Sequence, residues 1–288
     1  MKWVNENINV FGGDRNKVTL FGESAGAASV GYHLVNAEST KYFRRAIMHS
    51  GSQLCPWAYM RPDNVQKRAK ALFAAVGCDQ SAAASLLECL RRVPAGDFVD
   101  KDWVISNMMF FPWVPTNDGD FVRQNPLKDL LSRSPSMNKE LIMATNKDEG
   151  TFWIVYNFRN QFSKEKNWIN ITRDELKSDF DALTADLPAT KQAIYADYTR
   201  SGAAGDGRYN AKLLDFILGD RHFTCPAESF VYQYPVKDKF YLQYYYRDSR
   251  ETWPPWMGVI HGADCQVRMI TYLQQGYANS IFSATCIR

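Results

Sequence analysis

The feature that most constrains this chain is a pentapeptide at residues 22–26, Gly-Glu-Ser-Ala-Gly, with Ser24 at its centre. The apolar run at residues 18–21 precedes it, and the small residues at 25–30 follow it. A strand that passes into a helix through so sharp a turn holds the serine hydroxyl out ahead of the helix. A Cβ atom on either glycine would collide with the neighbouring strand or helix. We therefore expect a strand–turn–helix unit that exposes Ser24 as a nucleophile.

Further along the chain, short apolar runs alternate with helical patterns. The runs at residues 45–49, 141–145 and 240–246 are predicted to be strands. Apolar residues recur at helical spacing over five longer segments, at about 63–76, 82–92, 172–180, 189–199 and 207–219. A strand on each side of a helix predicts a parallel sheet. No stretch resembles a linker, so we expect one α/β domain with helical insertions.

The overall composition excludes several classes of protein. The 288 residues are 45% hydrophobic and 23% charged, which is ample apolar material for one large core. The net charge is +3 and the basic residues are scattered, so we expect neither nucleic-acid binding nor a polybasic membrane patch. No apolar run is long enough to span a membrane, and residues 1–5 lack the apolar core of a signal peptide. The six cysteines have no C-x-x-C spacing, and we expect neither a metal nor a cofactor.

A serine nucleophile needs a base, and the base needs an acid that fixes its tautomer. The chain has four histidines. His33 lies on the helix after Ser24 and is expected to point away from it, whereas His49 ends a strand and is expected to be structural. His222 follows Gly219 at what resembles a helix C-terminus, where a capping role is expected. His261 lies in a loop after a late strand and is the expected base.

The acid should lie between Ser24 and His261 in the sequence and should follow a strand. Asp148 and Glu149 both meet this condition, because they come just after the run at 141–145. Asp118 stands in an Asn-Asp-Gly sequence and is equally well explained as a turn residue. Chain order therefore prefers Glu149 or Asp148 to Asp118 and leaves the choice between the first two open.

Four segments in this order resemble the type-B carboxylesterases, and within them the cholinesterase branch. They are residues 7–26 around the serine, 43–52 along the next strand, 147–152 with the sequence KDEGTF, and 253–262 with the sequence WPPWMGVIHG. The resemblance implies an α/β-hydrolase fold, with a central, mostly parallel sheet and helices on both faces. It selects Glu149 as the acid. It also implies that Ser24, His261 and Glu149 hydrolyse a small carboxylic ester through an acyl-enzyme, without a cofactor.

The resemblance assigns further roles next to the serine. Ala25 would offer a backbone N–H to the oxyanion hole, because this donor is the residue after the nucleophile. Glu23 would add negative potential that favours a cationic group on the substrate.

The resemblance also assigns roles to five aromatic residues. Trp57 and Phe111 are similar to acyl-pocket walls, which limit the size of the acyl group. Phe152, Tyr156 and Trp253 are similar to aromatic gorge positions, where a quaternary ammonium gains a cation–π contact. Plain core packing is the alternative for each of these five residues.

Two features indicate an oxidising compartment. Cys78 and Cys89 resemble the family's small disulfide loop, and Cys225 resembles one half of another bridge. Asn170 opens the only glycosylation sequon, which agrees with secretion. Thr172 of that sequon also opens a helix-capping box, and both roles can hold at once. We expect the protein to be secreted or displayed on the extracellular surface.

The chain also departs from the family pattern. The first third of the family's domain, with its Gly-rich oxyanion loop, has no counterpart here, and residues 265–288 resemble nothing in the family. We therefore expect a partial carboxylesterase domain over residues 1–264 and a divergent tail over 265–288. With one oxyanion donor, ester hydrolysis should be slow if it occurs at all. The alternatives are an inactive product and a cholinesterase-like adhesion protein, which the retention of Ser24, Glu149 and His261 argues against.

Overall fold

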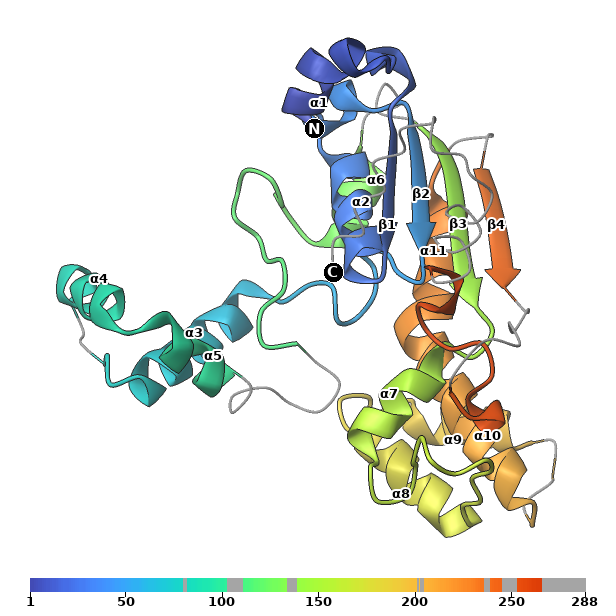
Figure 1. Cartoon of the computed structure of the whole chain (residues 1–288). Helices are drawn as coiled ribbons and strands as arrows, with labels where there is room; N and C mark the ends of the chain where they lie inside the picture. The colour runs from blue at the N-terminus through green and yellow to red at the C-terminus, as the bar shows by residue number, and fades with distance from the viewer. Residues whose placement is uncertain are drawn as a thin grey trace. The chain divides into compact units, whose positions relative to one another are not determined.

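The computed structural model describes residues 1–79, 82–102, 111–133, 139–200, 202, 205–235, 239–244 and 253–265. The chain divides into two compact units, which are described separately. The first consists of Met1–Pro56 and the chain from Pro126 onward, and the second of Trp57–Asn125. The elements are labelled in Figure 1.

The first unit is built on a four-stranded sheet in which sequence order and spatial order coincide (Figure 1). Every neighbouring pair of strands is parallel. The strands are β1 (Thr19–Glu23), β2 (Arg45–His49), β3 (Glu140–Asn146) and β4 (Lys239–Tyr244). These strands and their parallel pairing confirm the sequence prediction, although residues 245–246 of the expected fourth strand lie outside the described residues.

One face of the sheet carries the core of this unit. Ala46 and Met48 of β2 and Leu141 and Met143 of β3 alternate with outward-facing neighbours, as the two-residue period of a strand requires. All four side chains are at most 2% exposed and belong to one hydrophobic cluster. The core therefore comes from strand alternation in a parallel register.

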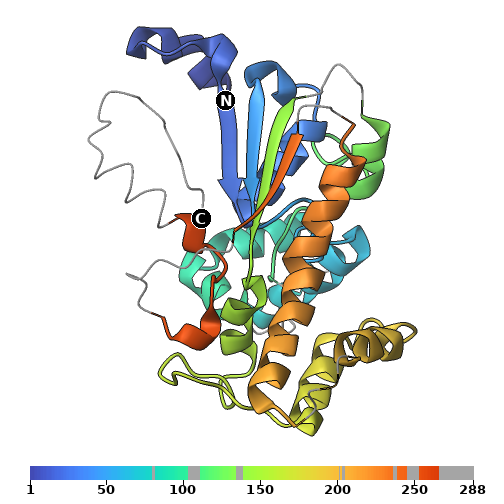
Figure 2. The same cartoon turned by 90° about the vertical axis from the view of Figure 1, so that its right-hand side faces the viewer.

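Three helices complete this cluster: α2 (Ala25–Val35), α6 (Pro126–Ser132) and α11 (Cys225–Gln233). They lie on the same side of the sheet, as Figure 2 shows. Residues on the opposite face of β4 are more exposed, at 66% for Phe240 and 48% for Leu242. This unit thus combines a well-packed sheet face with a second face that keeps apolar side chains accessible.

A second group of helices follows the carboxyl end of β3. Helix α7 (Glu149–Asn157) begins directly after this strand and packs against α10 (Gly207–Gly219). The approach is close, because a Cβ atom on Gly150 would lie 2.2 Å from the carbonyl oxygen of Asp215. Only glycine at this position allows α7 to leave the sheet so near α10.

The prediction that His222 caps a helix C-terminus is wrong. Helix α10 ends at Gly219, but the chain stays helical beyond it and runs through a π-helical turn, Asp220–Thr224, directly into α11. His222 is buried within this turn, and burial lowers its pKa to about 3. Gly219 instead permits the close contact with α7, since a Cβ atom there would lie 3.2 Å from the nitrogen of Gly150.

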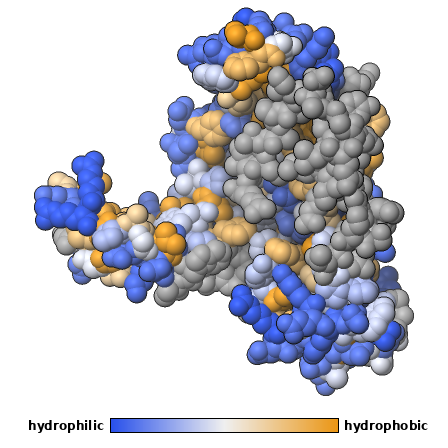
Figure 3. Space-filling model, viewed as in Figure 1, coloured by the Kyte–Doolittle hydropathy of each residue, from blue (hydrophilic) through white to orange (hydrophobic). Residues whose placement is uncertain are grey.

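The remaining helices of the first unit are α1 (Lys2–Asn7), α8 (Arg173–Leu183) and α9 (Lys191–Thr199). Helix α8 begins with the predicted capping box. The Thr172 hydroxyl accepts a hydrogen bond from the N–H of Glu175, and the Glu175 carboxylate accepts one from the N–H of Thr172. In Figure 3 the surface around α8 is largely hydrophilic. Among the described residues, no helix combines the length and apolar character needed to cross a bilayer.

The second unit is helical in its described part. It contains α3 (Pro62–Ala75), α4 (Ala83–Arg92) and α5 (Ala95–Asp102), of which the first two confirm predicted helices. Cys78 and Cys89 form a disulfide between α3 and α4. This is the bridge that the resemblance to the carboxylesterases implied.

Candidate active site

Ser24 lies in a strained turn between β1 and α2. Its φ of 56° and ψ of −118° are uncommon for a residue with a side chain. The Ser24 N–H donates to the carbonyl of His49 over 2.8 Å, and the Ser24 carbonyl accepts from Ala28 over 3.1 Å. A Cβ atom on Gly22 would lie 2.2 Å from the carbonyl oxygen of Gly26. The predicted strand–turn–helix unit is therefore present, and Gly22 allows its close approach.

Three of the predicted site residues meet in one chain of hydrogen bonds. The Nε2 atom of His261 lies 2.8 Å from the hydroxyl oxygen of Ser24. The Nδ1 atom of the same ring lies 2.6 Å from a carboxylate oxygen of Glu149. The side chains of His261 and Glu149 are 8% and 1% exposed. The arrangement can pass a proton from the hydroxyl to the imidazole while the carboxylate stabilises the resulting charge.

Two residues that the sequence analysis did not single out hold Glu149 in place. Its other carboxylate oxygen accepts from the hydroxyl of Ser50 over 2.5 Å and from the N–H of Asn146 over 2.7 Å. The Asn146 side chain also donates to the carbonyl of Ile260 over 2.9 Å, which ties the histidine loop to β3. Ser50 follows β2 and Asn146 ends β3. Their position at the carboxyl ends of neighbouring parallel strands is the sequence feature that could have identified them.

The two alternative acids lie in different surroundings. Asp148 accepts from the N–H of Val259 over 2.6 Å and forms an ion pair with Lys212. Asp118 belongs to the second unit and accepts from two backbone N–H groups of its own turn. Glu149 is thus the carboxylate that contacts the histidine, and chain order alone could not select it.

The charges around His261 favour the protonated form of its imidazole. Burial by itself lowers the pKa of His261, but the negative charge and hydrogen bond of Glu149 more than offset this and raise the pKa above its usual value. Glu23 lies 3.4 Å from the Nε2 atom of His261, and burial raises the pKa of Glu23 to about 7. The site therefore carries more negative charge above pH 7 than below it.

Comparison with known proteins agrees with this geometry. The profile of the carboxylesterase family matches residues 1–283. The chain belongs to the carboxylesterase family. This membership and the parallel sheet confirm the predicted α/β-hydrolase fold. The profile extends beyond residue 264, whereas residues 266–288 lie outside the described part, so the divergent tail stays a prediction.

Several relatives of this chain are named cholinesterases. The chain is 34% identical over 282 residues to acetylcholinesterase 1 of Caenorhabditis briggsae and 33% over 271 residues to the acetylcholinesterase of Bungarus fasciatus. It is 35% identical over 265 residues to the acetylcholinesterase of Myxine glutinosa. These matches cover 91%, 92% and 90% of this chain, and 45%, 44% and 78% of the respective relatives. The chain thus spans less than half the length of the first two relatives.

Two of the predicted gorge residues form an aromatic pair near His261. The rings of Phe152 and Tyr156 are 4.8 Å apart, and the Phe152 ring lies 6.4 Å from that of His261. The Nζ atom of Lys164 lies 5.7 Å and 5.6 Å from the centres of the Phe152 and Tyr156 rings. The pair thus already contacts a cation from its own chain.

Two further aromatic rings, which the sequence analysis did not single out, pack against the imidazole of His261. The Phe223 ring lies 4.4 Å and the Trp153 ring 6.2 Å from the centre of the His261 ring. Trp153 directly follows a predicted gorge residue, whereas nothing in the local pattern around Phe223 indicates a site. The predicted gorge residue Trp253 donates its indole N–H to the carbonyl of Gly258, within its own loop, over 2.8 Å.

The remaining predicted residues keep their roles as predictions. Ala25 is the first residue of α2, and its N–H is among the first-turn amides that a helix cannot pair internally. Trp57 and Phe111 contact each other edge to face at 6.3 Å within the second unit. Asn170 is exposed, as a glycosylated residue must be, while the hydroxyl of Thr172 takes part in the capping box.

The other histidines and Cys225 have structural surroundings. His33 bonds to the hydroxyl of Ser39 over 2.9 Å, away from the elbow. His49 is buried and hydrogen-bonded to Asp264, as expected of a structural residue. Cys225 is a free thiol among the described residues, and the second bridge that the resemblance implied for it stays a prediction.

Proposed function

We propose that this chain hydrolyses carboxylic esters through an acyl-enzyme formed on Ser24. The observation that carries the proposal is the continuous hydrogen-bonded series from Ser24 through His261 to Glu149. Membership of the carboxylesterase family supports the reaction class. The strained turn at Ser24 supports the same role, because backbone strain of this kind clusters at functional sites.

In the first half of the reaction, Ser24 Oγ attacks the ester carbonyl while Nε2 of His261 takes the hydroxyl proton. Glu149 stabilises the imidazolium that forms. Collapse of the tetrahedral intermediate breaks the bond to the alcohol, which leaves with the proton from His261. In the second half, water attacks the acyl group on Ser24 with His261 again as base, and the carboxylic acid departs.

Stabilisation of the oxyanion is assigned to Ala25, through its N–H at the start of α2. Loss of a single oxyanion-hole donor costs about 10²- to 10³-fold in kcat, so turnover depends strongly on such donors. A probe that needs one covalent event therefore tests the serine more directly than a turnover assay.

We further propose a preference for esters with a cationic alcohol, such as choline. Glu23 supplies negative charge above pH 7, and the rings of Phe152 and Tyr156 offer cation–π contacts. Several similar proteins are named acetylcholinesterases. A cationic substrate has to replace Lys164 on the two rings, so the preference depends on how readily this side chain moves.

An extracellular location is part of the same proposal. The disulfide between Cys78 and Cys89 is typical of secreted and cell-surface proteins. The exposed sequon asparagine, Asn170, is compatible with glycosylation in that compartment.

The proposal is tested by labelling the purified chain with a fluorophosphonate, which traps an activated serine. We expect one label per chain, absent from Ser24→Ala and unchanged in Ser29→Ala, a matched control on the exposed side of the same helix. Absence of labelling in soluble, folded protein would contradict the proposal and favour the adhesion role or an inactive product.

The same assay tests the preference for cations. Tetramethylammonium should slow the labelling of Ser24, and more so at pH 8 than at pH 6, because Glu23 is ionised above its raised pKa of about 7 and neutral below it. Equal protection by the uncharged analogue neopentyl alcohol, or none by tetramethylammonium, would contradict the preference while leaving the esterase proposal intact.

A further inference from the structure

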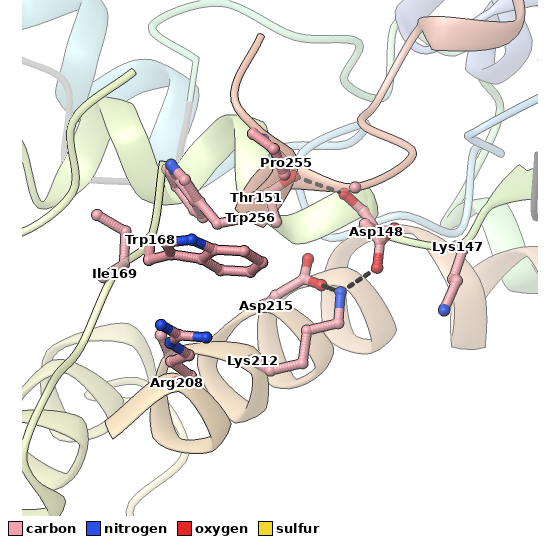
Figure 4. Close-up of a pocket in the computed structure, with 12 residues that line it drawn as sticks. Lys147, Asp148, Thr151, Trp168, Ile169, Arg208, Lys212, Asp215, Pro255 and Trp256 are labelled. Atoms are coloured by element: carbon pink, nitrogen blue, oxygen red, sulfur yellow. Dashed lines mark hydrogen bonds and ion pairs between the residues drawn. The ribbon is translucent and has the colours of Figure 1, made fainter. Parts of the chain in front are cut away.

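The first unit contains a cavity of about 280 Å³ that the proposed hydrolysis does not use. It lies between α10, the start of α7 and the loop before His261 (Figure 4). Ser24, Glu149 and His261 are not among the residues that line it. Its volume is close to the lower end of small-molecule sites, roughly 300–1,000 Å³, so it suits a ligand of one or two rings.

Helix α10 forms one wall. Arg208, Ala211, Lys212 and Asp215 follow one another at intervals of three, one and three residues, which places them on one helix face. The small side chain of Ala211 leaves the space between the two basic residues open. The wall therefore presents two cations about one helical turn apart, with a gap between them.

Lys212 is a fixed cation at the inner end of this wall. Its ammonium group forms ion pairs with Asp148 and, over 2.6 Å, with Asp215. Burial lowers the pKa of Lys212, but the two carboxylates more than compensate, so the group stays charged. An ammonium group has three donors, of which two are used here; the Nζ atom also lies 4.9 Å from the centre of the Phe216 ring, so the remaining N–H reaches a further acceptor in place of that ring contact.

Arg208 is a second cation, nearer the surface. Its guanidinium lies 4.4 Å from the centre of the Trp168 ring. Within the described part of the chain, no carboxylate lies within ion-pair distance of Arg208. A stacked guanidinium without an anionic partner is well suited to bind a carboxylate through two parallel hydrogen bonds.

The opposite walls are apolar and aromatic. Trp168 separates Arg208 from Pro255 and Trp256 in Figure 4, and Ile169 lies beside it. The Trp256 indole is held in place by a hydrogen bond to the carbonyl of Ser163 over 3.3 Å. These groups form a surface against which a planar ring can pack.

We propose that this cavity binds a small aromatic carboxylate. The ring packs against Trp168, Pro255 and Trp256, and the carboxylate accepts from Arg208 and from the remaining N–H of Lys212. A cationic ligand is disfavoured, because the lining carries three basic side chains, Lys147, Arg208 and Lys212, against the two carboxylates of Asp148 and Asp215. The binding does not depend on ester hydrolysis, since no residue of the proposed catalytic series lines the cavity.

The proposal is tested by calorimetric titration of the Ser24→Ala chain with three indoles of the same shape. Indole-3-acetate is the anion, indole-3-acetamide the neutral analogue and tryptamine the cation. We expect the anion to bind on the order of tenfold more tightly than either analogue, as a charge-assisted hydrogen bond implies. Equal affinities, or tighter binding of tryptamine, would overturn the proposal.

Protein variants locate the site. Arg208→Gln should weaken indole-3-acetate binding on the order of tenfold and abolish the preference over the amide. Arg200→Gln is the matched control, because Arg200 is exposed and pairs with Asp197 on α9. Arg208 is exposed, so its variant should fold, which circular dichroism can verify. Unchanged binding in folded Arg208→Gln would assign the ligand to another site and contradict the proposal.

Discussion

Two serines at the candidate active site share an unusual backbone conformation. The φ angles of Ser24 and Ser50 are 56° and 55°, and each residue directly follows a strand of the parallel sheet. Such conformations cost about 1–3 kcal/mol each and persist where the surroundings enforce them. Here the neighbouring strand does so, because Ser24 donates to the carbonyl of His49 and Ser50 to that of Ala144. The strain directs the Ser24 hydroxyl to His261 and the Ser50 hydroxyl to Glu149.

Glu149 is expected to control both the rate and the pH dependence of Ser24 labelling. Glu149→Gln removes the charge that stabilises the imidazolium, so the rate should fall on the order of 10⁴-fold. The negative charge of Glu149 also raises the pKa of His261. The base is active when neutral, so labelling should increase as pH rises through this pKa. Loss of the charge should move that increase to lower pH, as labelling rates between pH 5 and 9 can show.

A matched control separates this effect from a general loss of charge. Glu38→Gln changes an exposed glutamate of the same unit and should leave rate and profile unchanged. A Glu149→Gln profile that rises at the same pH as that of the unchanged chain would contradict the assigned coupling between the two residues.

At the scale of elements, the contact between α7 and α10 positions Glu149 at the start of α7. The first residues of α7 pass so close to α10 that Gly150→Ala would place a methyl group 2.2 Å from a backbone oxygen. Backbone atoms cannot rotate away as a side chain can, so one helix must shift. We expect Gly150→Ala to lower the free energy of unfolding by about 1–3 kcal/mol, as overpacking usually does. Urea unfolding followed by circular dichroism measures this change.

Gly205→Ala is the control, because nothing lies within 4 Å of a Cβ atom at Gly205. It should change the free energy of unfolding by less than about 1 kcal/mol. Equal effects of the two substitutions would mean that the close approach of α7 and α10 does not occur.

The strands were easier to predict from the sequence than the helices around the contact between α7 and α10. All four strands were predicted, because short apolar runs between turn residues identify buried parallel strands. Helix α7 was not, because its aromatic and β-branched residues show no clear helical period. Gly219 was taken for the point where the chain leaves the helix, whereas it allows close packing against α7 and a π-helical turn follows it. A glycine in a helical pattern therefore has two meanings that sequence alone does not separate.

Some residues of the candidate site were predictable from the sequence and others were not. The series Ser24, His261 and Glu149 was predictable because each residue stands in a motif that a family resemblance can carry. Ser50 and Phe223 were not, because their contacts depend on the alignment of strands and helices distant in sequence. Local motifs thus point to the candidate reacting groups, whereas the groups that hold them follow from the tertiary structure.

At the scale of the whole molecule, the two units differ in how they are stabilised. The first has a continuous core between its sheet and three helices. In the second, neither α4 nor α5 contains a buried residue. Its described buried apolar side chains, among them Met60, Leu72 and Val122, lie outside these two helices, so α4 depends on a cross-link, which the disulfide between Cys78 and Cys89 provides. We therefore expect the second unit to respond most strongly to reduction.

The disulfide closes a short loop, which by chain entropy stabilises a fold by roughly 2–3 kcal/mol. Its removal in a Cys78→Ser/Cys89→Ser variant should lower the amide-exchange protection of α3 and α4 on the order of 30- to 100-fold. Protection of β2 and β3 should stay nearly unchanged, because the first unit has its own core. Hydrogen exchange measured by mass spectrometry reports both regions in one experiment, and Cys55→Ser, at a buried free thiol of the first unit, is the control. Equal loss of protection in both units would show that they unfold together and that the bridge stabilises the whole chain.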